Sequence, residues 1–150
     1  MPHKKKKVVA VSGGFDPVHI GHVRMFADAR KLGDELVVIL NNDNWLRFKK
    51  GFAFMTEYER KEVLEAFGVV DRVVVTKHEP DTLDISICRE LEALRPDIFA
   101  NGGDRKDDNI PEYSLCKQLG IKMVFNVGQG GKVQSSSRLV KDVKAKKVKK

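Results

Sequence analysis

Two histidines, His19 and His22, follow a glycine-rich turn near the start of the chain. The apolar run Val8–Val11 before that turn predicts the end of a buried strand, and residues 20–32 have the apolar spacing of a helix. Where a strand, a glycine turn and a helix start meet, free backbone N–H groups form a site for anions. Residues three apart share one face of a helix, so both imidazoles should face a phosphate bound at this turn.

Further polar clusters follow three other segments that read as strands: Lys49 and Lys50 after residues 35–40, Asp104 after residues 97–100, and Ser135, Ser136, Ser137 and Arg138 after residues 121–127. Ligands of parallel sheets bind beyond the carboxyl ends of the strands. The four clusters can therefore share one cleft.

The elements that must position these residues alternate along the chain. Strands are expected at 8–11, 35–40, 72–76, 97–100 and 121–127, and helices at 20–32, 56–67, 83–94 and 111–120, with a last one from Ser135. Gly33 is expected to cap the first helix, and residues 41–55, which lack periodicity, form a long functional connection. This alternation predicts an α/β fold with a doubly wound, five-stranded parallel sheet of the Rossmann-like kind.

Length and charge indicate one domain over residues 1–150, with lysine-rich tails at about 1–7 and 141–150. Lys4–Lys7 contribute +4 and Lys141–Lys150 +5, so the residues between them carry −2 of the net charge of +7. Such lysine runs are more typical of frayed, solvated ends than of a nucleic-acid surface. We therefore expect no nucleic-acid partner.

The two cysteines, the other two histidines and the apolar runs show no pattern that is typical of a functional site. Cys88 and Cys116 lack a metal-ligand spacing and are expected to be reduced, buried residues, and His3 and His78 to lie on the surface. No apolar stretch reaches the length of a signal-peptide core or a membrane span, which predicts a cytoplasmic protein without a membrane partner.

With Gly14-Phe15-Asp16 before it, the His19-Ile20-Gly21-His22 motif resembles the signature of the cytidylyltransferase-type nucleotidyltransferase superfamily. The resemblance extends over most of the chain, through Lys50-Gly51, Arg60 to Asp71, Gly102-Gly103-Asp104 and the serine run. These segments are similar to those of small cytidylyltransferases, among them glycerol-3-phosphate cytidylyltransferase, and of the adenylyltransferase domain of ADP-heptose synthesis.

The resemblance implies that the phosphate of a small acceptor attacks the α-phosphorus of a nucleoside triphosphate and that pyrophosphate leaves. Such transfer needs positioning and charge neutralisation. His19, His22 and Lys50 are the expected catalytic residues and Asp16 and Arg60 the expected substrate contacts. Nucleotide contacts are expected from Gly14, Phe15, Gly21, Lys49, Gly103, Asp104, Ser135, Ser136, Ser137 and Arg138. No dedicated carboxylate cage is visible, so Mg²⁺ would be held mainly through the triphosphate.

Two pairs of substrates are compatible with the resemblance. CTP and a phosphorylated alcohol, sugar or phosphonate are the expected pair, and ATP with a sugar phosphate or flavin-type acceptor is the alternative. Ala53-Phe54 stands where close relatives carry Arg-Pro, which also leaves open a nucleotide-binding module without turnover. A homodimer through the helix that carries Tyr58 and Phe67 is compatible with the sequence.

Overall fold

The computed structural model describes residues 5–102 and 111–128, and these form one five-stranded sheet. Its strands are β1 (Val8–Gly13), β2 (Glu35–Leu40), β3 (Arg72–Val75), β4 (Ile98–Gly102) and β5 (Lys122–Val127). Every pairing between neighbours is parallel, and the order across the sheet is β3-β2-β1-β4-β5. The doubly wound parallel sheet expected from the sequence is confirmed.

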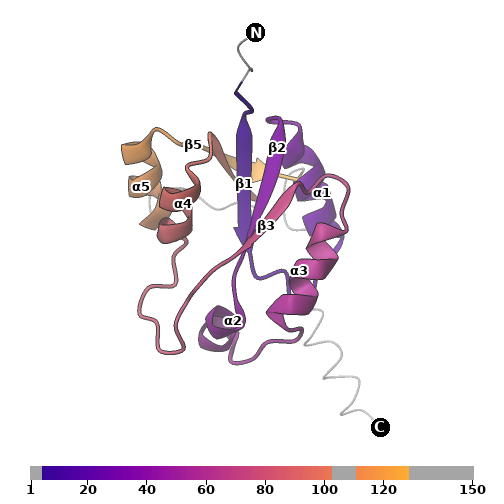
Figure 1. Ribbon diagram of the computed structural model, residues 1–150, viewed down its shortest axis with the longest axis vertical. Helices are drawn as coiled ribbons and strands as arrows, with labels where there is room; N and C mark the ends of the chain where they lie inside the picture. The colour runs from indigo at the N-terminus through magenta and orange to yellow at the C-terminus, as the bar shows by residue number, and fades with distance from the viewer. Residues whose placement is uncertain (1–4, 103–110, 129–150) are drawn as a thin grey trace.

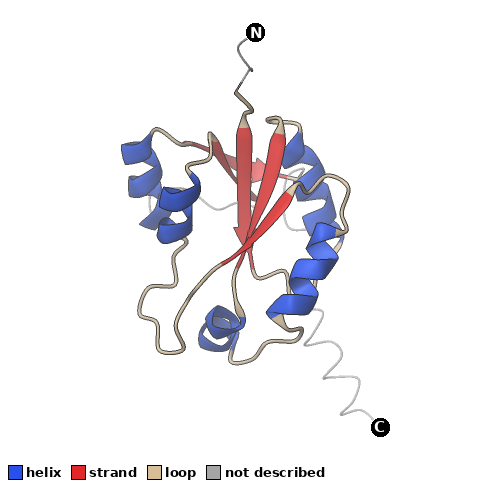
Figure 2. Cartoon of the chain, in the orientation of Figure 1, coloured by secondary structure: helices blue, strands red, loops and turns tan. Residues whose placement is uncertain are grey.

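Helices cover both faces of this sheet. They are α1 (Ile20–Arg30), α2 (Asp43–Lys50), α3 (Glu57–Glu65), α4 (Cys88–Leu94) and α5 (Pro111–Leu119). In Figure 1, α1 and α3 lie on one side of the strands and α4 and α5 on the other. Figure 2 shows the same layers with the helices in blue and the strands in red.

Two apolar cores hold the layers together, and β2 contributes to both. Leu36, Val38 and Leu40 pack in the core beneath α1 and α3, whereas Ile39 packs in the core beneath α4 and α5. Successive side chains of a strand point to opposite faces, so a strand covered on both faces must be apolar throughout. This burial explains the unbroken apolar run of β2.

The strand order reverses beside β1, which pairs with β2 on one edge and with β4 on the other. Such a reversal leaves a crevice beyond the carboxyl ends of the strands. The β1–α1 turn, which carries His19 and His22, starts at this edge, and α2 lies beyond it in Figure 1. The fold therefore places the histidine pair and the lysines that end α2 at the same end of the sheet.

The expectation that residues 41–55 form an irregular connection is wrong in part, because α2 lies inside it. Asn42 caps the helix by accepting a hydrogen bond from the Trp45 N–H at 3.0 Å. Gly51 ends it with a φ of +86°, a left-handed conformation that glycine adopts without steric cost. An asparagine and a glycine bracketing eight residues were the signal for this helix.

Two further boundary expectations are wrong. Leu83 is 99% exposed, and the helix after β3 begins only at Cys88, so the leucine spacing overextended it. Gly33 does not cap α1, whose last residues are closed by Lys31. A Cβ at Gly33 would lie 2.7 Å from the Lys7 carbonyl oxygen, so the glycine is needed for the close approach of two chain segments.

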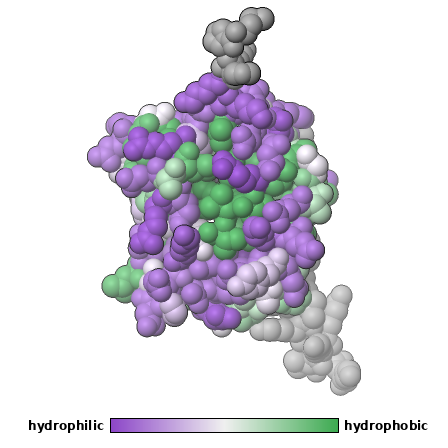
Figure 3. Space-filling view, in the orientation of Figure 1, coloured by the Kyte–Doolittle hydropathy of each residue, from purple (hydrophilic) through white to green (hydrophobic). Residues whose placement is uncertain are grey.

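The cysteines and the outer surface agree with a well-packed α/β protein. Both cysteines are free thiols, with Cys116 buried and Cys88 half-buried, and burial raises the pKa of Cys116 to about 11. On the face in Figure 3, apolar side chains gather over the middle and hydrophilic ones surround them. Within residues 5–102 and 111–128, no helix is long and apolar enough to cross a membrane.

Candidate active site

His19 and His22 form the reciprocal cap of the helix that they begin. His19 is the N-cap residue, and its Nδ1 accepts a hydrogen bond from the Gly21 N–H at 3.1 Å. The His22 Nδ1 accepts in turn from the backbone N–H of His19 at 3.2 Å. A neutral imidazole that accepts at Nδ1 carries its proton on Nε2. Both rings are thereby fixed as Nε2–H donors.

The two rings stack on each other, with centroids 3.8 Å apart. Burial, together with the nearby His19 ring and the Lys50 ammonium, lowers the pKa of His22 from 6.5 to about 3. His22 is therefore neutral throughout the physiological range. It can donate a hydrogen bond to a phosphate oxygen without carrying a charge, and the positive charge of the site must come from elsewhere.

Phe15 supports the histidine turn from within the core. Its ring lies edge-on to His22 at 4.8 Å and to Phe26 at 5.2 Å between centroids, and its side chain is buried. A Cβ at Gly13 would lie 3.0 Å from this ring. The predicted nucleotide contact of Phe15 can thus involve only its backbone.

Lys49 and Lys50 end α2 and are exposed. A positive charge in the last turn of a helix is stabilised by the helix dipole. The influence of Lys50 on the pKa of His22 places its charge near the histidine turn. Gly14 and α2 are also in close contact, since a Cβ at Gly14 would lie 2.9 Å from Leu46 Cδ2.

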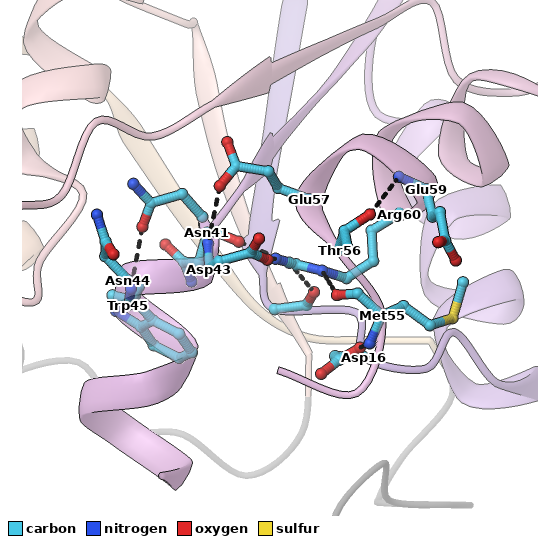
Figure 4. A network of polar contacts seen from close by, with 12 residues as sticks. Asp16, Asn41, Asp43, Asn44, Trp45, Met55, Thr56, Glu57, Glu59 and Arg60 are labelled. Atoms are coloured by element: carbon cyan, nitrogen blue, oxygen red, sulfur yellow. Dashed lines mark hydrogen bonds and ion pairs between the residues drawn. The ribbon is translucent and has the colours of Figure 1, made fainter. Parts of the chain in front are cut away.

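Asp16 and Arg60, the predicted substrate contacts, bond to protein groups in the structure. The buried Asp16 carboxylate accepts from the backbone N–H groups of Phe54 and Met55, and the buried Arg60 guanidinium donates to four oxygens of the protein (Figure 4). Substrate contact by either residue stays a prediction. No local pattern indicates these internal bonds, because most of them join residues far apart in the chain.

His78 is not the isolated surface residue expected from the sequence. Its Nδ1 lies 2.8 Å from Thr76 Oγ1 and its Nε2 2.9 Å from the Ser86 carbonyl oxygen. Its own carbonyl oxygen accepts from the side-chain amides of Asn42 and Asn44. His78 therefore connects the segment after β3 to the start of α2. Polar residues after a strand end were the signal that the sequence offered.

Several predicted residues lie outside the described part of the chain: Gly103, Asp104, Ser135, Ser136, Ser137 and Arg138, together with His3, the expected last helix and most of both lysine-rich tails. Within the described part, no three His, Cys, Asp or Glu side chains are grouped so that they could hold a metal ion. Binding of Mg²⁺ mainly through the triphosphate stays a prediction.

Comparison with known proteins identifies relatives of two kinds. The chain is 43% identical over 107 residues to FAD synthase of Thermococcus sibiricus, which covers 70% of this chain and 69% of that protein. It is 32% identical over 142 residues to the bifunctional protein HldE of Desulfatibacillum aliphaticivorans, which covers 93% of this chain. The chain spans only 27% of that HldE protein.

A solved structure supports the same relationship. The lipopolysaccharide core biosynthesis protein of Thermoplasma volcanium superposes with a TM-score of 0.65 at 30% identity, over 81% of this chain and 94% of the other. The family model described as cytidylyltransferase-like matches residues 10–139, which include the histidine turn, both lysines and the serine run. The chain therefore belongs to the cytidylyltransferase-like family of nucleotidyltransferases.

Proposed function

We propose that this protein transfers the adenylyl group of ATP to the phosphate of a flavin acceptor and releases pyrophosphate. An oxygen of the acceptor phosphate forms a bond to the α-phosphorus of ATP as the bond from that phosphorus to the bridging oxygen of pyrophosphate breaks. The observation that carries the proposal is the pair of stacked imidazoles held as Nε2–H donors at the start of α1. Neutral, preorganised donors at a helix start suit the crowded oxygens of this transition state.

The remaining predicted residues take roles around that pair. Lys50, with Lys49 beside it, supplies the positive charge that the neutral histidines lack. Backbone contacts from Gly14 and Gly21 to the nucleotide stay predictions, and Mg²⁺ held through the triphosphate would neutralise further charge. Base and triphosphate contacts by Gly103, Asp104, Ser135, Ser136, Ser137 and Arg138 stay predictions.

Two observations favour ATP and a flavin over the CTP expected from the sequence. FAD consists of an adenylyl group joined to a flavin phosphate, and the FAD synthase relatives match this chain over most of their own length. The Phe54 side chain, four residues after Lys50, is 54% exposed. An exposed aromatic ring beside the site suits a flat aromatic acceptor.

A sugar phosphate is the second candidate acceptor, because the HldE relatives match up to 98% of this chain. Ring stacking on Phe54 would then contribute nothing, so Phe54→Ala would leave turnover unchanged. With a flavin acceptor the same substitution should raise the KM of the acceptor several-fold.

The first experiment measures the melting temperature with Mg²⁺ and ATP, CTP, GTP or UTP separately. A ligand at 100 times its dissociation constant stabilises the folded state by about 2.7 kcal/mol, which is several degrees for a domain of this size. We expect a shift with ATP that is smaller in His22→Ala. A shift with CTP alone would return the function to a cytidylyltransferase, and no shift with any nucleotide would overturn the proposal.

Turnover is then measured with FMN and ATP by following FAD formation. Riboflavin is the matched control acceptor, since it has the same ring system but lacks the attacking phosphate. We expect FAD from FMN alone. Formation of a nucleotide sugar from a sugar phosphate, with none of FAD from FMN, would establish the second candidate instead.

We further propose that the protein acts in the cytoplasm and forms a homodimer. The apolar surface over the middle of the face in Figure 3 is compatible with pairing of two copies. Light scattering after size exclusion tests the dimer, for which the mass should be twice that of the 16.9 kDa chain.

A further inference from the structure

Asp16 joins the two segments that carry the positive and hydrogen-bonding groups of the site. Its carboxylate is 4% exposed, and its two oxygens accept from the backbone N–H groups of Phe54 at 2.6 Å and Met55 at 2.7 Å. Asp16 lies three residues before His19, and Phe54 lies four residues after Lys50. One side chain therefore ties the histidine turn to the segment that follows α2.

Arg60 joins the same region from α3, and its side chain is 1% exposed. Its Nη1 donates to the carbonyl oxygens of Gly14 at 2.8 Å and Asn41 at 2.6 Å, which follow the ends of β1 and β2. Its Nη2 donates to Asp43 Oδ1 at 2.7 Å, and its Nε donates to the Met55 carbonyl oxygen at 3.0 Å. Figure 4 shows the guanidinium reaching from α3 across to the start of α2.

A buried guanidinium is a costly way to gain stability. Replacing a buried ion pair by apolar side chains of similar volume is often neutral or stabilising. What an apolar residue could not provide is directional bonds to several segments at once. Arg60 makes such bonds to three of them: the segment after β1, the segment from the end of β2 to the start of α2, and the segment before α3.

We propose that Asp16 and Arg60 are positioning residues that hold the lysine-bearing end of α2 at the correct distance from the histidine turn. This role rests on the proposed function, because it concerns how the site is assembled for transfer. The histidines are already fixed by their own reciprocal cap. Arg60 bonds to Asp43 at the start of α2 and Asp16 bonds to Phe54 and Met55 after it, so the two buried side chains set the place of the end of α2 relative to the histidine turn.

The role predicts a specific kinetic signature. Loosening the segment after α2 should leave nucleotide binding at the histidine turn in place while the lysine charge is misplaced in the transition state. A misplacement of about 1 Å can cost on the order of 100-fold in rate. We therefore expect kcat to fall at least tenfold in Asp16→Asn and Arg60→Lys, with the KM for ATP changed by less than about threefold.

Thr56→Ala is the matched control variant. Thr56 Oγ1 accepts from the Glu59 N–H and caps α3, so its loss destabilises the same helix while every hydrogen bond of the Asp16 and Arg60 side chains and of the histidine turn is retained. We expect the melting temperature of Thr56→Ala to fall while its kcat stays within about twofold of the unchanged protein. An equal fall of kcat in this control, or no fall in Asp16→Asn, would overturn the positioning role.

Amide hydrogen exchange tests the same role without turnover. Asn at position 16 retains one carbonyl oxygen and replaces the other acceptor by an NH₂ group, so Phe54 or Met55 loses its partner. We expect faster exchange at residues 51–55 in Asp16→Asn, with the amides of α1 unchanged. Unchanged exchange at residues 51–55 would overturn the proposal. The proposed function fails separately, if the unchanged protein shows neither a melting-temperature shift with a nucleotide nor adenylyl transfer. The exchange data would still decide whether Asp16 holds residues 51–55 in place.

Discussion

The histidine turn and the lysine-bearing end of α2 lie at the same end of the sheet but are held in different ways. Around His19 and His22, each ring is fixed by a backbone hydrogen bond, by stacking and by partial burial. Lys49 and Lys50 are exposed charges in the last turn of a short helix. The hydrogen-bond donors of the site are thus held by the fold and neutral, whereas its charges lie on exposed side chains.

This difference follows from solvation. A buried cation without a partner would be costly, so the enclosed donors are neutral imidazoles. Ammonium groups at the surface remain hydrated, which avoids this cost. The site therefore combines enclosed, preorganised donors with cations at the surface.

The largest loss of activity is expected at the histidine turn. In His22→Ala the site loses one fixed Nε2–H donor, and removal of one such donor costs about 10²–10³-fold in kcat. Steady-state transfer assays at saturating ATP and acceptor measure this loss. A decrease of less than about threefold would mean that the fixed geometry of the turn contributes nothing to transfer.

A smaller loss of activity is expected at the lysines that end α2. A hydrogen bond from a charged group contributes about 1.5–3 kcal/mol, so Lys50→Ala should lower kcat/KM about 10- to 100-fold. Lys49→Ala is the matched control, because it removes the neighbouring exposed charge. Equal losses in the two variants would show that the site uses their summed charge rather than the position of Lys50.

Salt provides a second comparison of the same variants. Exposed charges are screened by salt, so the rate of the unchanged protein should fall between about 0.01 and 0.15 M ionic strength. The rate of Lys50→Ala should fall less over this range. If the rates of the two proteins fell equally with salt, the charge that is screened would not be that of Lys50.

The smallest effect should appear in the stability of the turn with pH. The pKa of His22 is lowered from 6.5 to about 3, so its contribution to stability is present above pH 6.5 and is lost as the pH falls towards 3. His22→Gln, which retains an acceptor for the His19 N–H but does not titrate, should lose less stability over this range. Thermal unfolding between pH 7 and pH 4 measures the difference, and parallel curves for the two proteins would contradict the buried, neutral state of His22.

Most elements could be predicted because their signals are local. The unbroken apolar run of β2, the capping residue Thr56 and the glycine that ends α5 each act within a few residues of the chain. The helix α2 had local signals too, in Asn42 and Gly51, but its short length and charged end concealed them. The predicted start of α4 was wrong because Leu83 continues the apolar spacing of the helix in the sequence. In the structure, Leu83 is exposed and lies before the helix.

The histidine pair, its place at a helix start, the parallel sheet and the family could all be predicted, since they depend on spacing and residue type along the chain. The roles of the buried polar residues became visible only in the folded molecule. Asp16 and Arg60 bond to Phe54, Gly14 and Asn41, which are 38, 46 and 19 residues away. A local pattern cannot show whether a carboxylate or guanidinium faces a ligand or a distant backbone group, because only the folded chain brings those partners within hydrogen-bond distance.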